Sequence, residues 1–202
     1  MSGRDTLGAL LADVRACRLC AAHLPDGPRP VIQAARSSRL LIVGQAPGRK
    51  VHASGMPFDD ASGNRLRGWL GIDRETFYDA QRIAIVSMGF CFPGSSRNGD
   101  LPPRPECART WHPRIMPMLK HVQLTLAIGQ YAQAGLLGTR CGANLTDTVS
   151  AWREHLANGL LPLPHPSPRN QAWLKHNPWF EAELLPILRR EVAQALDMPS
   201  RH

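Results

Sequence analysis

Four cysteines have the types and spacing of metal ligands. Two form a Cys-x-x-Cys pair, and two more follow about seventy residues later with fifteen residues between them: Cys17, Cys20, Cys91 and Cys107. A Cys-x-x-Cys pair places two sulfurs on one turn, and a second pair completes a four-thiolate site for zinc or an iron–sulfur cluster. Zinc ribbons usually repeat the short pair, so the long, proline-rich second spacing favours a cluster. The alternative is four ordinary buried thiols.

Two loops carry residues suited to ligand binding and proton transfer. The first is Gly44-Gln45-Ala46-Pro47-Gly48, which matches neither a P-loop nor a dinucleotide-binding turn. The second is His165-Pro166-Ser167-Pro168-Arg169-Asn170. Its prolines stiffen the backbone, and its histidine can donate or accept a proton near neutral pH. A single His-Pro-Ser turn arises easily by chance, so the signal lies in the pair of loops.

Short apolar runs lead into these loops. We predict strands over residues 40–43, 83–86, 124–128 and 160–163, each ending in a glycine or proline loop. We predict helices over 5–16, 62–70, 106–120, 130–137 and 178–196, with Pro113, Pro117 and Pro186 kinking or shortening two of them. Apolar runs that alternate with helices are typical of a parallel sheet covered on both faces. The sequence thus predicts one α/β domain over residues 1–202, a three-layer α/β/α fold with a central four-stranded parallel sheet and ligands at the strands' carboxyl ends.

Composition limits the classes of function. The chain has 202 residues, 43% of them hydrophobic and 20% charged, and no run of eighteen apolar residues, so we expect a globular monomer with no membrane span. The first residues lack a secretory signal, which favours the cytoplasm, where thiols stay reduced and available to metals. Cys141 is interpreted as a spare thiol. The net charge of +8 predicts an acidic partner, with nucleic acid as the leading candidate and a merely basic surface as the alternative.

Further motifs accompany the two loops and the cysteines. They are the turn Met56-Pro57-Phe58-Asp59-Asp60-Ala61-Ser62-Gly63, the segments Cys91-Phe92-Pro93-Gly94 and Pro105-Glu106-Cys107, and Leu126-Ala127-Ile128-Gly129 with the residues after it. Together they span roughly residues 17–190 and resemble the uracil-DNA glycosylase superfamily, most closely its iron–sulfur fourth and fifth families. The resemblance implies the superfamily's fold and a 4Fe–4S cluster on Cys17, Cys20, Cys91 and Cys107, with zinc as the alternative.

The resemblance also implies an activity, which is base excision repair by a monofunctional DNA glycosylase. Such an enzyme flips uracil or a related lesion out of DNA and hydrolyses its N-glycosidic bond. Phe58 resembles the stacking phenylalanine and His165 the histidine that stabilises the leaving base. The loop residues Gly44, Gln45 and Ala46 would then face the base, and the expected DNA contacts are Pro47, Gly48, Lys50, Ser167, Arg169 and Asn170. No lysine in the motif loops suggests Schiff-base chemistry, and Lys50 is assigned to phosphate contact.

The chain departs from these families at positions that matter for catalysis. Gln45 and Ala46 stand where relatives carry an acid or asparagine, so a carboxylate must come from elsewhere. The fifth family uses an aspartate before Ser-Gly, which implies Asp60, with Asp59 as second choice; the alternative is that both only cap the next helix. Ser87 replaces the asparagine that reads uracil, so a wider range of bases, including hypoxanthine or xanthine, is a further expectation.

The loop after His165 also differs. Arg169 replaces the usual wedge leucine, so Trp173 or Leu174 would supply a wedge, unless the tryptophan simply packs the last helix. Two other functions stay open. One is a damage- or abasic-site-binding protein of the same fold that has lost catalysis, and the other is an iron–sulfur protein that binds RNA or a protein partner.

Overall fold

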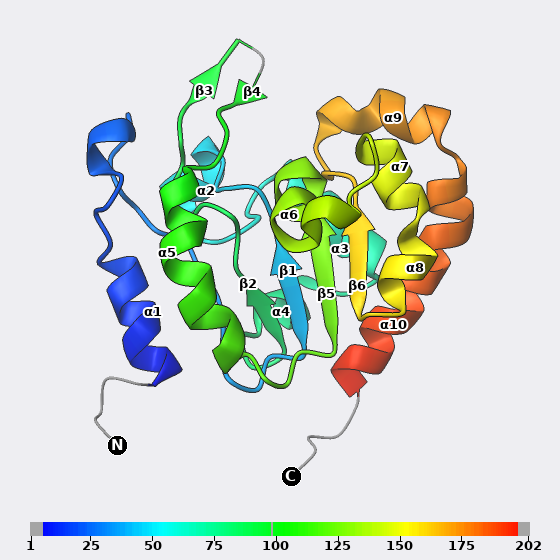
Figure 1. Ribbon diagram of the computed structural model, residues 1–202, viewed down its shortest axis with the longest axis horizontal. Helices are drawn as coiled ribbons and strands as arrows, with labels where there is room; N and C mark the ends of the chain where they lie inside the picture. The colour runs from blue at the N-terminus through cyan, green and yellow to red at the C-terminus, as the bar shows by residue number, and fades with distance from the viewer. Residues whose placement is uncertain (1–5, 98, 198–202) are drawn as a thin grey trace.

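The computed structural model describes residues 6–97 and 99–197, and at its centre lies a parallel sheet of four strands (Figure 1). Leu40 pairs with Ile83 on one side and Leu124 on the other, and Leu126 pairs with Leu161. The four predicted strands are confirmed. Their order across the sheet is β2 (Ile83–Ile85), β1 (Leu40–Val43), β5 (Leu124–Ile128) and β6 (Leu160–Leu163).

Alternate side chains of the strands enter two cores, one on each face of the sheet. Leu40 and Ile42 of β1 point into the first core, while Leu41 and Val43 point into the second. The first core is covered by α3 (Ala61–Leu70), α4 (Arg74–Tyr78), α7 (Leu145–Ser150), α8 (Trp152–Leu156), α9 (Gln171–His176) and α10 (Leu185–Asp197). The second is covered by α1 (Leu7–Arg15), α5 (Pro105–Ile115) and α6 (Gly129–Leu137). Figure 1 shows α5 and α6 in front of the sheet with α3 and α4 behind it, which confirms the three-layer architecture.

Two predicted helices are interrupted near their prolines, as expected. The helix expected to reach residue 120 ends at Ile115 and continues as a 3₁₀ turn, η2 (Met116–Met118). Pro117 has no N–H to continue the α-helical ladder. The long C-terminal helix is divided into a π-helical turn, η5 (Phe180–Leu184), and α10. Pro186 sits just after that turn, where it cannot donate to the carbonyl of residue 182.

The short elements were not predicted. They include α4, α7, α8 and α9, together with α2 (Arg49–Ser54), the hairpin strands β3 (Ser95–Ser96) and β4 (Gly99–Asp100), and the 3₁₀ turns η1 (Ala21–His23), η3 (Gly138–Arg140) and η4 (Pro168–Asn170). Helices of five or six residues show too little hydrophobic periodicity to detect and depend on tertiary packing for their stability. Capping residues nevertheless mark two of them. Asp73 accepts from the Thr76 N–H at 2.7 Å at the start of α4, and Asn144 caps α7.

All four strands run in one direction, so their carboxyl ends share one edge of the sheet, the upper edge in Figure 1. The loops after β1, β2, β5 and β6 meet there, and the β3–β4 hairpin projects from the same edge. Within the described residues, no helix combines the length and the apolar character needed to cross a bilayer.

Candidate functional site

A cavity of about 560 Å³ opens at the carboxyl edge of the sheet. Both predicted loops and the acidic turn before Ser62 contribute to it, so segments more than one hundred residues apart converge on one space. The predicted residues that line it are Gln45, Ala46, Pro47, Gly48, Phe58, Asp60, Ser87, His165, Ser167, Arg169 and Asn170. Three other predicted residues, Gly44, Lys50 and Asp59, are not among its lining residues.

Gly44 directly follows β1 and allows two side chains to approach the end of that strand. A Cβ atom on Gly44 would lie 3.1 Å from Cζ of Phe58 and 3.4 Å from Oγ of Ser87. Phe58 therefore lies against the backbone of the first loop, beside the hydroxyl of Ser87. A planar ring and a hydroxyl at the base of a cavity suit the binding of a flat heterocycle.

Phe58 has a backbone conformation that is unusual for a residue with a side chain. Its φ of 55° falls in the left-handed region, and among the described residues it is the one non-glycine with positive φ. The helix that follows packs directly on this turn, because a Cβ on Gly63 would lie 1.7 Å from the carbonyl oxygen of Phe58. Only glycine fits at position 63 without moving the turn.

Asp60 caps α3 and also lines the cavity. Its Oδ1 accepts a hydrogen bond from the N–H of Gly63 at 2.9 Å, while the same carboxyl group faces the cavity. Asp60 can therefore cap the helix and contribute to the site at the same time. The hydrogen bond from Gly63 fixes one oxygen of its carboxylate and so orients the other.

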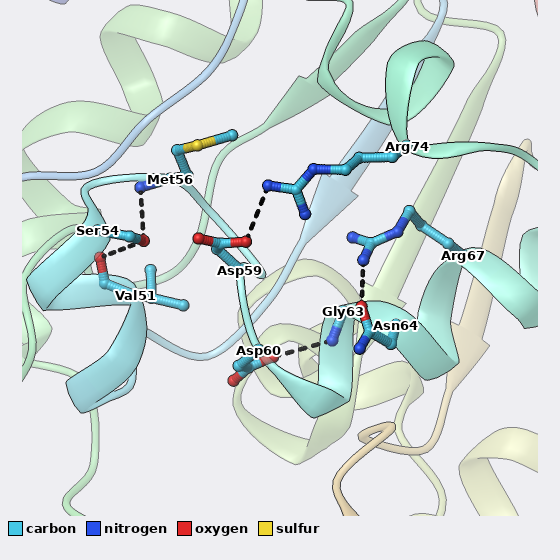
Figure 2. Close-up of polar contacts among 9 residues, drawn as sticks. All are labelled: Val51, Ser54, Met56, Asp59, Asp60, Gly63, Asn64, Arg67 and Arg74. Atoms are coloured by element: carbon cyan, nitrogen blue, oxygen red, sulfur yellow. Dashed lines mark hydrogen bonds and ion pairs between the residues drawn. The ribbon is translucent and has the colours of Figure 1, made fainter.

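Asp59 is directed away from Asp60, towards α4 (Figure 2). Its Oδ1 accepts from Nη2 of Arg74 at 3.0 Å, and this hydrogen bond is the main reason that the pKa of Asp59 is lowered. Adjacent residues of an extended turn point to opposite sides, so only one of the two aspartates can face the cavity.

His165 is arranged as a neutral hydrogen-bond donor. Its Nδ1 accepts from the backbone N–H of Ser167 at 3.2 Å, which assigns the ring proton to Nε2. Burial lowers the pKa of His165, although the negative charges of Asp60 and Asp100 raise it in part. The side-chain amide of Asn170 donates to the His165 carbonyl at 2.7 Å and holds the loop in place.

Arg65 links α3 to the histidine loop. Its guanidinium donates from Nη1 to the carbonyl of Ser167 and from Nη2 to Oε1 of Gln171, both at 3.1 Å. The helix capped by Asp60 is thus tied to the loop that carries His165. Arg65 was not among the predicted site residues, since nothing in the local sequence marks a contact across more than one hundred residues.

Sequence reasoning missed several residues of the cavity. Asp100 is the most significant, since its carboxyl group lies near enough to His165 to affect the pKa of that residue. It follows the Asn-Gly pair at residues 98 and 99, a typical hairpin turn sequence that would have predicted β3 and β4. The other residues that were missed are Val31, Val51, Pro57, Ser62, Gly99 and Gln130.

The proposed DNA-contacting residues occupy different settings. Arg169 packs its guanidinium against Gly99 of the hairpin, where a Cβ would lie 1.9 Å from Nη1. Lys50 is exposed on α2, outside the cavity. Of the two candidate wedges, Leu174 is buried, whereas Trp173 is half-buried and packs edge-on against Phe180. The packing of Trp173 agrees with the alternative interpretation, and its role as a wedge stays a prediction.

A second, much smaller cavity of about 20 Å³ is lined by the four free cysteines Cys17, Cys20, Cys91 and Cys107, together with Arg104, Trp111 and other residues. Burial raises the pKa of Cys91 to about 11 and of Cys107 to about 12. Within the described part of the chain, no three His, Cys, Asp or Glu side chains are grouped closely enough to hold one metal ion. Cys141 is not among the residues that line this cavity.

One comparison with known proteins bears on this arrangement. A family model described as "Uracil DNA glycosylase superfamily" matches residues 32–189. The matched span includes all four strands of the parallel sheet and the predicted residues of the larger cavity. It also includes Cys91 and Cys107, but it begins after Cys17 and Cys20.

Proposed function

Because the chain belongs to the uracil DNA glycosylase superfamily, we propose that it hydrolyses the N-glycosidic bond of uracil, and of related deaminated bases, in DNA. Members of this superfamily are DNA glycosylases, and the finer assignment to this chain is our proposal. The observation that carries it is the meeting of Asp60, His165 and Phe58 in one cavity. Segments distant in sequence supply a carboxylate, a neutral imidazole and an aromatic ring, which are the groups that base excision requires.

His165 is assigned to the leaving base. As the N-glycosidic bond lengthens, negative charge develops on the oxygens of the departing pyrimidine, and the Nε2–H donates to one of them. The lowered pKa of His165 keeps its ring neutral. A neutral imidazole suits this role because it can donate a hydrogen bond to the anion without transferring its proton. The base departs as an anion and takes its proton later from solvent.

Asp60 is assigned to the sugar and the attacking water. The sugar carbon becomes cationic as the bond breaks, and a nearby carboxylate stabilises that charge. The oxygen of a water molecule bonds to this carbon, and its proton passes to the carboxylate. The cap on Gly63 supports this assignment because it fixes the orientation of the carboxyl group. Asp100 is the competing carboxylate, since it lines the same cavity.

The base edge would be read by Ser87 and the first loop. The Ser87 hydroxyl rotates to act as either donor or acceptor, which makes it less selective than the fixed donor and acceptor of an asparagine amide. The Gln45 amide donates to the Leu101 carbonyl at 3.2 Å, so this contact directs its N–H group towards the loop after β4. These two features support a range of bases that includes hypoxanthine and xanthine beside uracil.

The DNA backbone would run along the mouth of the cavity. We assign phosphate contacts to Pro47, Gly48, Lys50, Ser167 and Arg169, and we assign Asn170 to holding the His165 loop. The net charge of +8 favours such a surface. One chain supplies every group named here, so a monomer suffices, and with no lysine assigned to the sugar the reaction is monofunctional.

We also propose that Cys17, Cys20, Cys91 and Cys107 hold a 4Fe–4S cluster, which would fix the N-terminal segment to α5. Zinc is disfavoured, because one ion needs its ligands about 2.3 Å from a single point, whereas a cluster spreads its thiolates over four irons. N–H groups support a thiolate set: Phe90 donates to Sγ of Cys107 at 3.3 Å. Trp111 also lines this cavity, and its buried indole nitrogen finds no hydrogen-bond partner among the residues that the structure describes. Thiolates and sulfides are the acceptors that such a donor lacks.

The test uses purified protein with a uracil-containing oligonucleotide, followed by alkali to cleave abasic sites. Asp60→Asn keeps a good helix cap but removes the charge, so we expect excision to fall about a hundredfold or more while the melting temperature stays close to that of the wild type. Asp100→Asn distinguishes the competing carboxylate. Full activity of Asp60→Asn, with loss in Asp100→Asn, would reverse the assignment.

A panel of duplex and single-stranded oligonucleotides carrying uracil, hypoxanthine or xanthine completes the test. Tight binding to damaged or abasic DNA with no excision of any base would replace the proposal by a damage-binding function. Equal affinity for damaged and undamaged strands, with no excision, would favour a partner other than damaged DNA.

A further inference from the structure

The turn that carries Phe58 and Asp60 is held from behind by α4. Arg74 of this short helix donates to Asp59 at 3.0 Å, and Phe77 of the same helix packs edge-on against Phe58 with ring centroids 6.2 Å apart. Arg74 and Phe77 are three residues apart, so they share one face of α4. That face therefore contacts two consecutive residues of the turn.

This support is needed because the turn is strained. Phe58 has a φ of 55°, a conformation that side-chain-bearing residues keep only when their surroundings enforce it. Gly63 blocks movement of the turn towards α3, since the Phe58 carbonyl occupies the place that a Cβ on Gly63 would take. Contacts on the other side, from Arg74 and Phe77, complete the restraint.

Stacked side chains in turn hold α4 in place. The Arg74 guanidinium lies 4.8 Å from the ring centroid of Tyr78, and the buried Arg67 of α3 lies 5.4 Å from that of Phe77. Arg67 also bonds to Asn64 on its own helix (Figure 2). These stacked side chains connect α4 to α3, the helix that Asp60 caps.

We propose that Asp59, Arg74 and Phe77 are positioning residues that set the direction of Asp60 and the ring of Phe58 towards the base. The proposal rests on the function proposed above. None of the three lines the cavity. Asp59, the second-choice catalytic acid from the sequence, thus acts through its neighbours rather than on the substrate.

The experiment measures single-turnover excision of uracil, DNA affinity and melting temperature for Arg74→Gln and Asp59→Asn. The matched control is Arg153→Gln, because Arg153 forms an exposed pair with Glu183, also at 3.0 Å, and neither residue lines the cavity. We expect the excision rate to fall about tenfold to a hundredfold in the two variants, with DNA affinity and melting temperature matching the control. Arg74→Lys should restore most of the rate, and the double variant should lose no more than either single one.

A second measurement does not depend on activity. Hydrogen exchange of the Gly63 amide, which donates to Asp60, should be faster in Arg74→Gln and Asp59→Asn than in Arg153→Gln. Unchanged exchange, or wild-type excision in both variants, would overturn the proposal. A wild-type protein that excises no base would instead refute the proposed function, and the exchange data would still decide whether Arg74 restrains the turn.

Discussion

The two cavities of this molecule differ in size, in lining and in what they suit. The larger, of about 560 Å³, is lined mostly by loop residues, among them the polar side chains of Asp60, Ser87 and His165. The smaller, of about 20 Å³, is lined by four thiols together with residues such as the buried Trp111, and burial raises the pKa of Cys91 and Cys107. A large cavity has room for a molecule that enters and leaves, whereas a small one lined by thiols suits a resident group. On the proposals above, the first cavity is the substrate site and the second a structural site.

One short segment joins the two cavities. Ser87 lines the larger one and Cys91 the smaller one, only four residues later. Helix α5 holds both ends of the segment: His112 Nε2 donates to the Ser87 carbonyl at 2.9 Å, and Cys107 accepts from the Phe90 N–H. Helix α5 therefore connects the lining of the smaller cavity to the lining of the larger one.

The largest effect should come from the tightest contact behind the larger cavity. Gly63→Ala would force a Cβ to within 1.7 Å of the Phe58 carbonyl, so we expect a loss of roughly 3 kcal/mol in the free energy of unfolding and about a hundredfold in excision. Gly68→Ala on the same helix is the control, because nothing lies within 4 Å of the place its Cβ would take and alanine favours helix by about 0.5–1 kcal/mol. Chemical denaturation and single-turnover assays measure both. Equal behaviour of the two variants would show that the turn is not fixed by this contact.

A smaller effect tests whether the second cavity holds a resident group. Trp111→Phe keeps an aromatic ring but removes the buried N–H, so we expect the visible absorption of the proposed cluster to be lost to a chelator about tenfold faster. Trp152→Phe is the control. Trp152 is also a buried tryptophan beside an arginine, Arg153, but it belongs to the core on the opposite face of the sheet. Iron and sulfide analysis gives the starting occupancy. Identical rates of cluster loss in the two variants would show that the Trp111 indole has no role at the cysteines.

The smallest effect concerns pH. Burial lowers the pKa values of His112 and His165 below the ordinary 6.5, so the folded protein keeps them neutral where the unfolded chain takes up protons. The unfolded state then binds more protons, and stability should fall as the pH drops below about 6.5. Thermal unfolding between pH 7.5 and 5 should show this slope, and His165→Gln should flatten it, whereas the exposed His121→Gln should not. A slope unchanged in His165→Gln would contradict a neutral buried imidazole.

Much of the fold was predictable because its signals are local. The four apolar runs predicted the four strands to within one residue, since a strand buried on both faces must be apolar at every position. The five longer helices were found from periodicity, and the prolines at 117 and 186 predicted the interruptions. Helices as short as α4 were missed because five residues do not complete enough turns to show a pattern.

The site was predictable in part. Motifs that resemble a known family marked both loops and the acidic turn, and the structure brings them to one cavity. Asp100 was missed because the hairpin that carries it was not predicted. Residue type alone could not separate Asp59 from Asp60, because adjacent carboxylates differ only in which side of the turn each one faces. The resemblance to the fifth family ranked Asp60 first, and Asp60 is the one that lines the cavity.

The sequence by itself determined the sheet, its connections and the chemical groups available: the thiols, one loop histidine and a pair of aspartates. Periodicity and residue type are properties of short segments, so they can be read without knowledge of tertiary contacts. Tertiary structure alone decided that Asp60 lines the cavity while Asp59 meets Arg74, that His165 keeps its proton on Nε2, and that Trp173 packs against Phe180. Direction, burial and pairing depend on residues distant in the chain, and only the folded arrangement brings those residues together.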